Sequence, residues 1–173
     1  MTTKILRDSN NLVNLTMRTF GNNPEEGAQI LHALSEASSN KLKSLLLGTN
    51  HEWWSKNGEW GTNETASQTL ASLLARQEQL EILSLFGNKL RGNSPLTILR
   101  ALRESAGSIQ TLKELNLSHC QFNTQKCCEE LCQLIAEAVS LERCEISGQN
   151  KSEPVVEPRN SIGSSGSAPK SRI

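Results

Sequence analysis

The segment LKELNLSHC, residues 112–120, has apolar side chains at its first, fourth and sixth positions and a cysteine at its ninth. Successive copies of this apolar spacing begin 30, 38, 32 and 29 residues apart. Five copies at such intervals indicate a chain built from repeated structural units. The copies are LVNLTM from Leu12, LKSLLL from Leu42, LEILSL from Leu80, LKELNL from Leu112 and LERCEI from Leu141.

Each copy alternates apolar and polar residues, which predicts a short strand with one buried face. Strands buried on both faces, as in a doubly wound sheet, would instead be almost continuously apolar. We therefore expect helices on one face of the sheet only. The side chains expected to face those helices are Leu15, Met17, Leu45, Leu47, Leu83, Leu85, Leu115, Leu117, Cys144 and Ile146. Those expected on the open face are Asn14, Thr16, Ser44, Ser84, Glu114, Asn116, Arg143 and Glu145.

The intervals between the copies leave room for a helix in each unit. Asn23 with Pro24, and Ser94 with Pro95, form a capping residue followed by a proline, which is typical of a helix start. Gly107 is expected to end the third helix. The second and fourth helices are expected in ETASQTLASLLARQ and CCEELCQLIAEA.

The fourth helix should begin near Thr124. Residues sixteen and nineteen positions after the first leucine of a unit recur as apolar or small side chains, so we expect them to be buried against the sheet. They are Ala28 and Leu31, Leu96 and Leu99, and Cys128 and Leu131.

The position eight residues after each first leucine is Phe20, Asn50, Asn88, Cys120 or Gln149. Three of these match the Asn or Cys of the pattern L-x-x-L-x-L-x-x-N/C, so the chain resembles the leucine-rich-repeat family. Its long, helical units are most similar to the ribonuclease-inhibitor-like type. The resemblance implies an α/β fold: a short right-handed solenoid, or horseshoe arc, with parallel strands on the concave face and helices on the convex face. Residues 1–149 would form this domain.

Residues 150–173 are rich in Pro, Ser and Gly, and we expect a disordered tail. Its final Ser-Arg-Ile has the form of a carboxyl-terminal recognition signal or a variant of a peroxisomal one, although such tripeptides recur by chance. Before the tail, Arg143 and Glu145 are charges of the kind that blunt an exposed sheet edge, so the solenoid is expected to end there.

The stretch HEWWSKNGEW, residues 51–60, holds all three tryptophans of the chain. It lies in an insertion, residues 51–63, that makes the second unit about eight residues longer than its neighbours. The loop either packs its rings on its own helix or presents them as binding anchors at the rim of the sheet. Apolar residues occur on the open strand face beside it, although scattered surface apolar side chains are also ordinary. The partner-binding candidates are Leu46, Trp53, Trp54, Trp60, Ile82 and Phe86.

Composition narrows the class of function. Eighteen basic and eighteen acidic residues cancel without long runs, which argues against a nucleic-acid binder. The start lacks the apolar core of a signal peptide, and no apolar run approaches the roughly 20 residues that span a bilayer. We therefore expect an intracellular, cytoplasmic protein that binds no membrane.

The five cysteines fit a reducing compartment, because an odd number, three of them in KCCEELC, is unlike a secreted disulfide framework. Cys128 and Cys132 are one helical turn apart, but Cys120 and Cys144 do not supply the second close pair that a structural zinc site usually has. We expect small buried thiols and no metal.

No catalytic arrangement emerges from the sequence. His51-Glu52 lacks the second histidine of a zinc-protease motif, and there is no Gly-rich phosphate loop. His119 and Cys120 are the nearest to a base and nucleophile, but Cys120 occupies the structural Asn/Cys position. We expect no cofactor and no enzymatic activity.

The sequence therefore favours a module that binds a protein partner, as an adaptor, a scaffold or a subunit of a larger assembly. The alternative is a regulator of a small GTPase, since the long units also resemble Ran GTPase-activating proteins. The mixed charges of residues 150–173 differ from the acidic tail of that branch.

Overall fold

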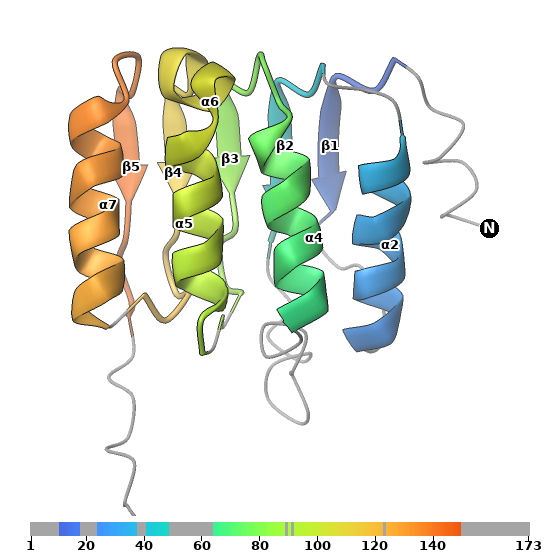
Figure 1. Ribbon diagram of the computed structural model, residues 1–173, viewed down its shortest axis with the longest axis horizontal. Coiled ribbons are helices and arrows are strands. Elements are labelled where there is room, and N and C mark those ends of the chain that lie inside the picture. Colours follow the sequence, from blue (N-terminus) through green and yellow to red (C-terminus); the bar gives the residue numbers. More distant parts are fainter. Residues whose placement is uncertain are drawn as a thin grey trace, which may run out of the picture.

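The computed structural model describes residues 11–17, 24–37, 41–48, 64–88, 90, 92–122 and 124–149. Over these ranges the protein is mixed α/β, with one layer of helices packed on one parallel sheet (Figure 1). The sheet has five strands in the order of the sequence, as predicted. They are β1 (Asn14–Met17), β2 (Ser44–Leu47), β3 (Ile82–Ser84), β4 (Glu114–Asn116) and β5 (Arg143–Glu145).

The strands pair in the register of the repeated motif. Leu15 lies beside Leu45, Leu45 beside Leu83, and Leu83 beside Leu115. Leu115 in turn lies beside Cys144. Equivalent positions of successive units therefore form continuous rows across the sheet. The row that contains these residues is leucine in four units and cysteine in the last.

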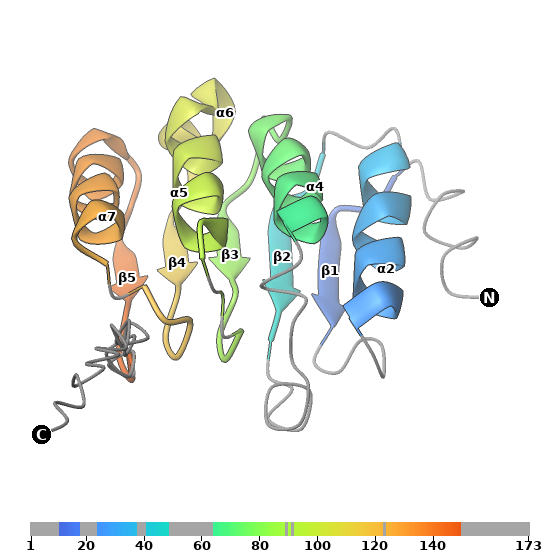
Figure 2. The same ribbon diagram turned by 60° about the horizontal axis from the view of Figure 1, so that its bottom comes forward.

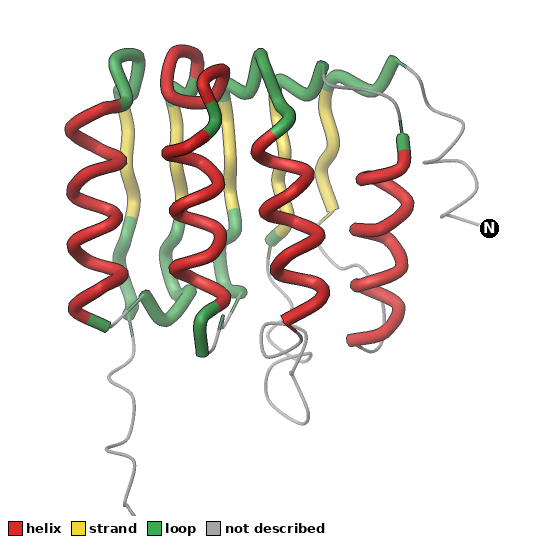
Figure 3. The backbone as a smooth tube through the Cα atoms, viewed as in Figure 1, coloured by secondary structure: helices red, strands yellow, loops and turns green. Residues whose placement is uncertain are grey.

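The helices of the described ranges all cover the same face of the sheet, which confirms the expectation from strand alternation (Figures 2 and 3). The opposite face carries no helix from the described part of the chain. The helices are α2 (Pro24–Glu36), α4 (Glu64–Ala75), α5 (Ser94–Glu104), α6 (Ala106–Thr111) and α7 (Gln125–Glu137).

Leucines fill the space between the sheet and the helices. The six inward leucines in or just after the three central strands are buried, and helix residues such as Leu31, Leu70 and Leu99 pack against them. Leu15, Met17 and Cys144, on the two outer strands, are only partly buried. The expectation that Ile146 is buried is wrong: it is 46% exposed. No helix of the described ranges follows β5 to cover it.

The helix boundaries follow the sequence closely but not fully. Pro24 is the first residue of α2, as expected, and the Thr124 hydroxyl accepts a hydrogen bond of 3.3 Å from the Cys127 backbone N–H at the start of α7. Ser94, in contrast, is the first residue of α5 rather than its cap, and Asn93 precedes it in the capping position.

The expected role of Gly107 is wrong. Helix α5 ends at Glu104, and Ser105 caps the next helix, α6, by accepting a hydrogen bond of 3.2 Å from Ser108. Gly107 lies inside α6, where an added Cβ atom would come within 2.5 Å of the Gln77 carbonyl oxygen. Glycine is needed there because α6 passes so close to the preceding unit.

Of the helix positions predicted to be buried, some are buried, some are half-buried and one is exposed. Leu31, Leu99 and Leu131 are buried, and Leu96 packs against the core while staying half-buried, as does Ala28. The prediction fails for Cys128, which is exposed, and the buried thiol of this turn belongs to Cys127. Cys132 is exposed as well.

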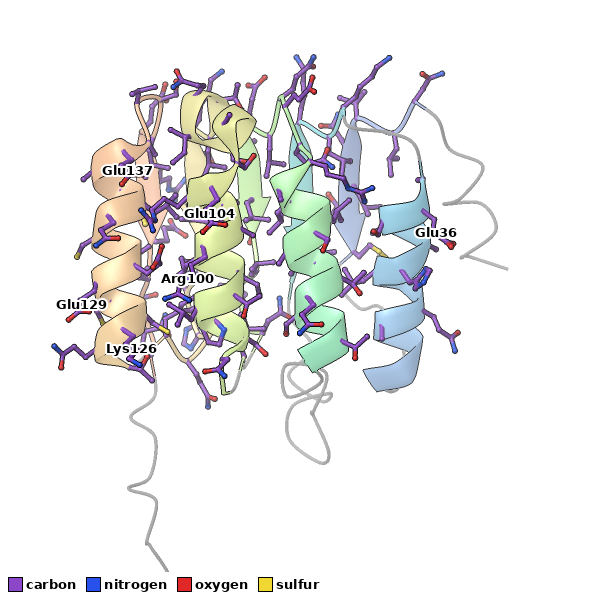
Figure 4. The ribbon with its side chains drawn as sticks, in the orientation of Figure 1. Glu36, Arg100, Glu104, Lys126, Glu129 and Glu137 are labelled. Carbon is purple, nitrogen blue, oxygen red and sulfur yellow. The ribbon has the colours of Figure 1, made fainter. Side chains whose placement is uncertain are left out.

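Ionic contacts tie neighbouring helices together along their flanks. The buried carboxylate of Glu130 on α7 lies between Arg103 at 2.5 Å and Arg100 at 3.4 Å, both on α5. Arg103 also reaches Glu137 at 3.4 Å, and Figure 4 shows Glu137 on α7 and Arg100 on α5. On the other side of α5, Arg76 donates to the Ser35 carbonyl oxygen at 2.6 Å, which links α4 to α2.

Candidate functional site

The open face of the sheet contains a shallow hollow of about 230 Å³. It extends over β2, β3, β4 and β5, and its floor is made of the outward side chains of these strands. They include Leu46, Ile82, Ser84, Glu114, Asn116 and Arg143. The hollow is apolar over β2 and β3 and charged over β4 and β5.

Leu46 and Ile82 make the apolar part of the hollow, and both are half-buried. Ser44 lies beside Ile82 and Leu46 beside Ser84, so the two apolar side chains are diagonal neighbours on adjacent strands. Side chains in this relation can contact one another. The structure therefore brings together two of the apolar residues that the sequence singled out for this face.

Phe86 lies just beyond β3, toward the carboxyl ends of the strands, and is half-buried. Its ring meets the imidazole of His119 edge-on, with centroids 5.4 Å apart. The remaining candidates, Trp53, Trp54 and Trp60, lie outside the described residues. So does the rest of the 51–63 insertion.

The sequence suggests His119 only as a possible base and does not indicate its place beside Phe86. It has a φ of 59°, the left-handed region that favours glycine, and the equivalent residues of the flanking units are Gly87 and Gly148. An added Cβ atom on Gly148 would lie 2.1 Å from the His119 ring, so glycine makes room for the imidazole. The signal in the sequence is a histidine at a position that glycine holds in the two flanking units.

The charged part of the hollow is a connected group of side chains. The Arg143 guanidinium pairs with the Glu145 carboxylate, which also accepts a hydrogen bond from the Asn116 side-chain amide. The Asn116 side-chain oxygen accepts a hydrogen bond of 3.0 Å from the Ser118 backbone N–H. These contacts hold the side chains of β4 and β5 in place before any partner arrives.

Below the rim, the ninth residue of each of the last three units bonds to the unit before it. Asn88 donates to the Leu47 carbonyl oxygen at 2.5 Å, and Gln149 donates to that of Leu117 at 2.7 Å. Cys120 donates its thiol proton to the Leu85 carbonyl oxygen at 2.7 Å. The three acceptors hold the same position in their units. Cys120 and Gln149 therefore make the same contact between units that Asn88 makes.

The Cys120 thiol is fully buried, and burial raises its pKa to about 12. At neutral pH the group is therefore protonated and acts as a hydrogen-bond donor. A thiol is a poor nucleophile compared with a thiolate. The neighbouring imidazole of His119 packs against Phe86, so the geometry gives this pair a structural use.

A row of alternating charges crosses the sheet just before the strands begin. Glu81 pairs with Lys43 at 3.5 Å and with Lys113 at 2.8 Å. The hydrogen bond and charge of Lys113 lower the pKa of Glu81, and the same contact with Glu81 raises the pKa of Lys113. Glu142 continues the row beside Lys113. The row is balanced in charge and so presents no strong field to a ligand.

Within the described ranges, no group of three or more His, Cys, Asp or Glu side chains is placed to hold a metal ion. The five cysteines are free thiols. None of the described helices combines the length and the apolar character needed to cross a bilayer.

No model of a protein family matches the chain, and no curated protein is significantly similar to it.

Proposed function

We propose that the chain is a leucine-rich-repeat module of the ribonuclease-inhibitor-like type that binds a protein partner. In this proposal the β-α units form a short right-handed solenoid, and its open strand face is concave. The hollow on that face, together with the tryptophan-bearing insertion, makes the binding surface. The protein acts by binding, as an adaptor, a scaffold or a complex subunit, and not as an enzyme.

The repeat assignment is supported by the contacts of the ninth residue. Asn88, Cys120 and Gln149 donate to the same carbonyl position of the preceding unit, as expected for units that stack one on the next. The parallel register and the single helical layer support it independently.

The single observation that carries the binding role is the open, half-apolar hollow. Leu46 and Ile82 lie beside Glu114, Arg143 and Glu145, a combination of apolar and charged groups that protein interfaces commonly use. Small-molecule sites are usually deeper and enclose most of the ligand. A shallow surface that crosses four strands fits a segment of another protein better.

The cellular setting belongs to the proposal too. Exposed Cys128 and Cys132, one helical turn apart, would be prone to oxidation outside the cell. We therefore propose an intracellular location, in the cytoplasm, for the module and its partner.

The test is affinity capture of partners from the source cell with the full chain, followed by measured binding of each purified partner. Ile82→Ala and Phe86→Ala should each weaken binding by about 2 kcal/mol if these side chains are interface anchors. Val139→Ala removes an exposed apolar side chain from the helical side, so it should leave the affinity unchanged.

Equal affinity for all three variants would contradict binding on the open face. The alternative function is tested in parallel, by adding the chain to a panel of small GTPases and measuring GTP hydrolysis. Stimulated hydrolysis would replace the proposal of a passive module with that of a regulator.

A further inference from the structure

The outer flank of α7 exposes an apolar stripe. Ile135 is 41% exposed and Val139, two residues past the helix, is 72% exposed. The exposed thiols of Cys128 and Cys132 precede Ile135 by seven and three residues, so these three side chains share one side of the helix. Val139 follows in the turn after the helix, where its backbone N–H donates to the Ile109 carbonyl oxygen. The other flank of α7 carries Glu130 and Glu137, which contact α5. The stripe therefore faces away from the rest of the described molecule.

The β5 strand beneath this stripe has an open edge. The backbone groups of Arg143, Glu145 and Ser147 bond to β4 and the turn after it: Arg143 donates to Lys113, and the carbonyl oxygens of Glu145 and Ser147 accept from Leu117 and His119. By the alternation of a parallel ladder, the N–H and C=O groups of Cys144 and Ile146 point the other way. The Ile146 carbonyl oxygen accepts a hydrogen bond of 3.3 Å from the Gln149 side chain. The outward groups of Cys144, at the middle of the strand, are not bonded by any described residue.

We propose that this edge binds the same edge of a second copy of the chain. A two-fold axis perpendicular to the sheet at Cys144 would pair the two β5 strands antiparallel and keep all helices on one side. Arg143 would then lie directly opposite Glu145 of the second copy, and Glu145 opposite its Arg143. Opposite charges in directly paired positions stabilise an antiparallel ladder.

The charge pattern favours this occupant over others. Edge charges of one sign would repel a second copy, whereas the two signs on either side of Cys144 complement themselves under a two-fold axis. Head-to-tail stacking would instead bring β5 against β1, whose outward Asn14 and Thr16 offer no charge to pair. The same axis sets the two α7 helices side by side with their apolar stripes toward each other.

The test measures the oligomeric state of the full chain by sedimentation equilibrium at up to about 100 µM, the range that detects weak association. The wild-type chain should form dimers. Arg143→Glu places two carboxylates at each contact and Glu145→Arg places two guanidinium groups there, so each variant alone should dimerise at least about tenfold more weakly.

Two further samples make the register itself testable. An equimolar mixture of the two single variants should form mixed dimers, and the double variant R143E/E145R should regain self-association. Glu36→Arg, a charge reversal on α2 at the opposite end of the sheet from β5, should leave the dimer unchanged. Val139→Asp should weaken it by disrupting the stripe.

Three results would overturn the inference. A wild-type chain that stays monomeric throughout the range contradicts it, and so do single charge reversals without effect. A full chain that is monomeric while a variant ending at Gln149 dimerises would show that residues 150–173 occupy the edge instead.

Discussion

Strands β4 and β5 carry the same motif, but their environments differ. Leu115 and Leu117 of the β4 unit are 1% and 0% exposed, whereas Cys144 at the first of these positions is half-buried and Ile146 at the second is 46% exposed. Helix α5 is flanked on both sides, and α7 on one. The alternation of apolar and polar residues along a strand thus predicts which face turns toward the helices. Neighbouring units decide how far that face is covered.

The largest effect on stability should come from truncating a buried leucine of an interior unit, and a truncation at the edge unit should cost much less. Leu115→Ala should lower the free energy of unfolding by roughly 2 to 5 kcal/mol, because the cavity lies between sheet and helices. Ile146→Ala, just after β5 at the motif position equivalent to Leu117, should cost well under about 1 kcal/mol, since its side chain is already half in water. Denaturant unfolding of both variants measures the difference, and equal losses would contradict it.

A second contrast lies on α7. Glu130→Ala leaves two arginines of α5 without their shared buried carboxylate, and we expect a loss of about 1 to 3 kcal/mol. Glu129 is its exposed neighbour and contacts Gln125 within the same helix, so Glu129→Ala should change stability by only a few tenths of a kcal/mol. A small effect for both variants in thermal unfolding would mean that the contact between α5 and α7 rests on leucines alone.

A third contrast compares two ninth-position residues. Asn88 is buried and donates to two carbonyl oxygens, so Asn88→Ala should cost about 1 to 3 kcal/mol. The Leu47 carbonyl oxygen would lose this donor, whereas that of Leu85 would keep the Cys120 thiol and the Asn88 backbone N–H. Gln149 is at the edge and half-buried, and Gln149→Ala should cost about half as much, because water can reach the freed groups. The opposite ranking in denaturant titrations would show that the edge unit is held as firmly as the interior one.

The smallest effect concerns pH. The pKa of Glu81 is lowered from its ordinary value of 4.5 by Lys113, so its carboxylate stabilises the fold above that value. This contribution should be lost as the pH falls below 4.5 and through the lowered pKa of the folded state. Lys113→Met should flatten that part of the stability curve. A curve of unchanged slope would indicate that the solvent-exposed pair contributes nothing measurable.

The sequence predicted the strand order, the single helical layer and the core leucines, because these follow from local alternation and a regular interval. It could not predict that Cys127 rather than Cys128 is buried, since the two differ only by the rotation of α7 against α5. Nor could it predict the use of Gly107, which depends on a backbone 30 residues earlier. For the site, strand alternation found Leu46 and Ile82, but the pairing of Phe86 with His119 depends on a contact between units.

The most direct test of the proposed function is hydroxyl-radical footprinting of the full chain, alone and in complex with a captured partner. Binding on the open face predicts that Leu46, Ile82 and Phe86, together with Trp53, Trp54 and Trp60, become protected, while Ile109 and Leu96 on the helical side keep their labelling. Protection of helical-side residues with no change on the open face would contradict the account.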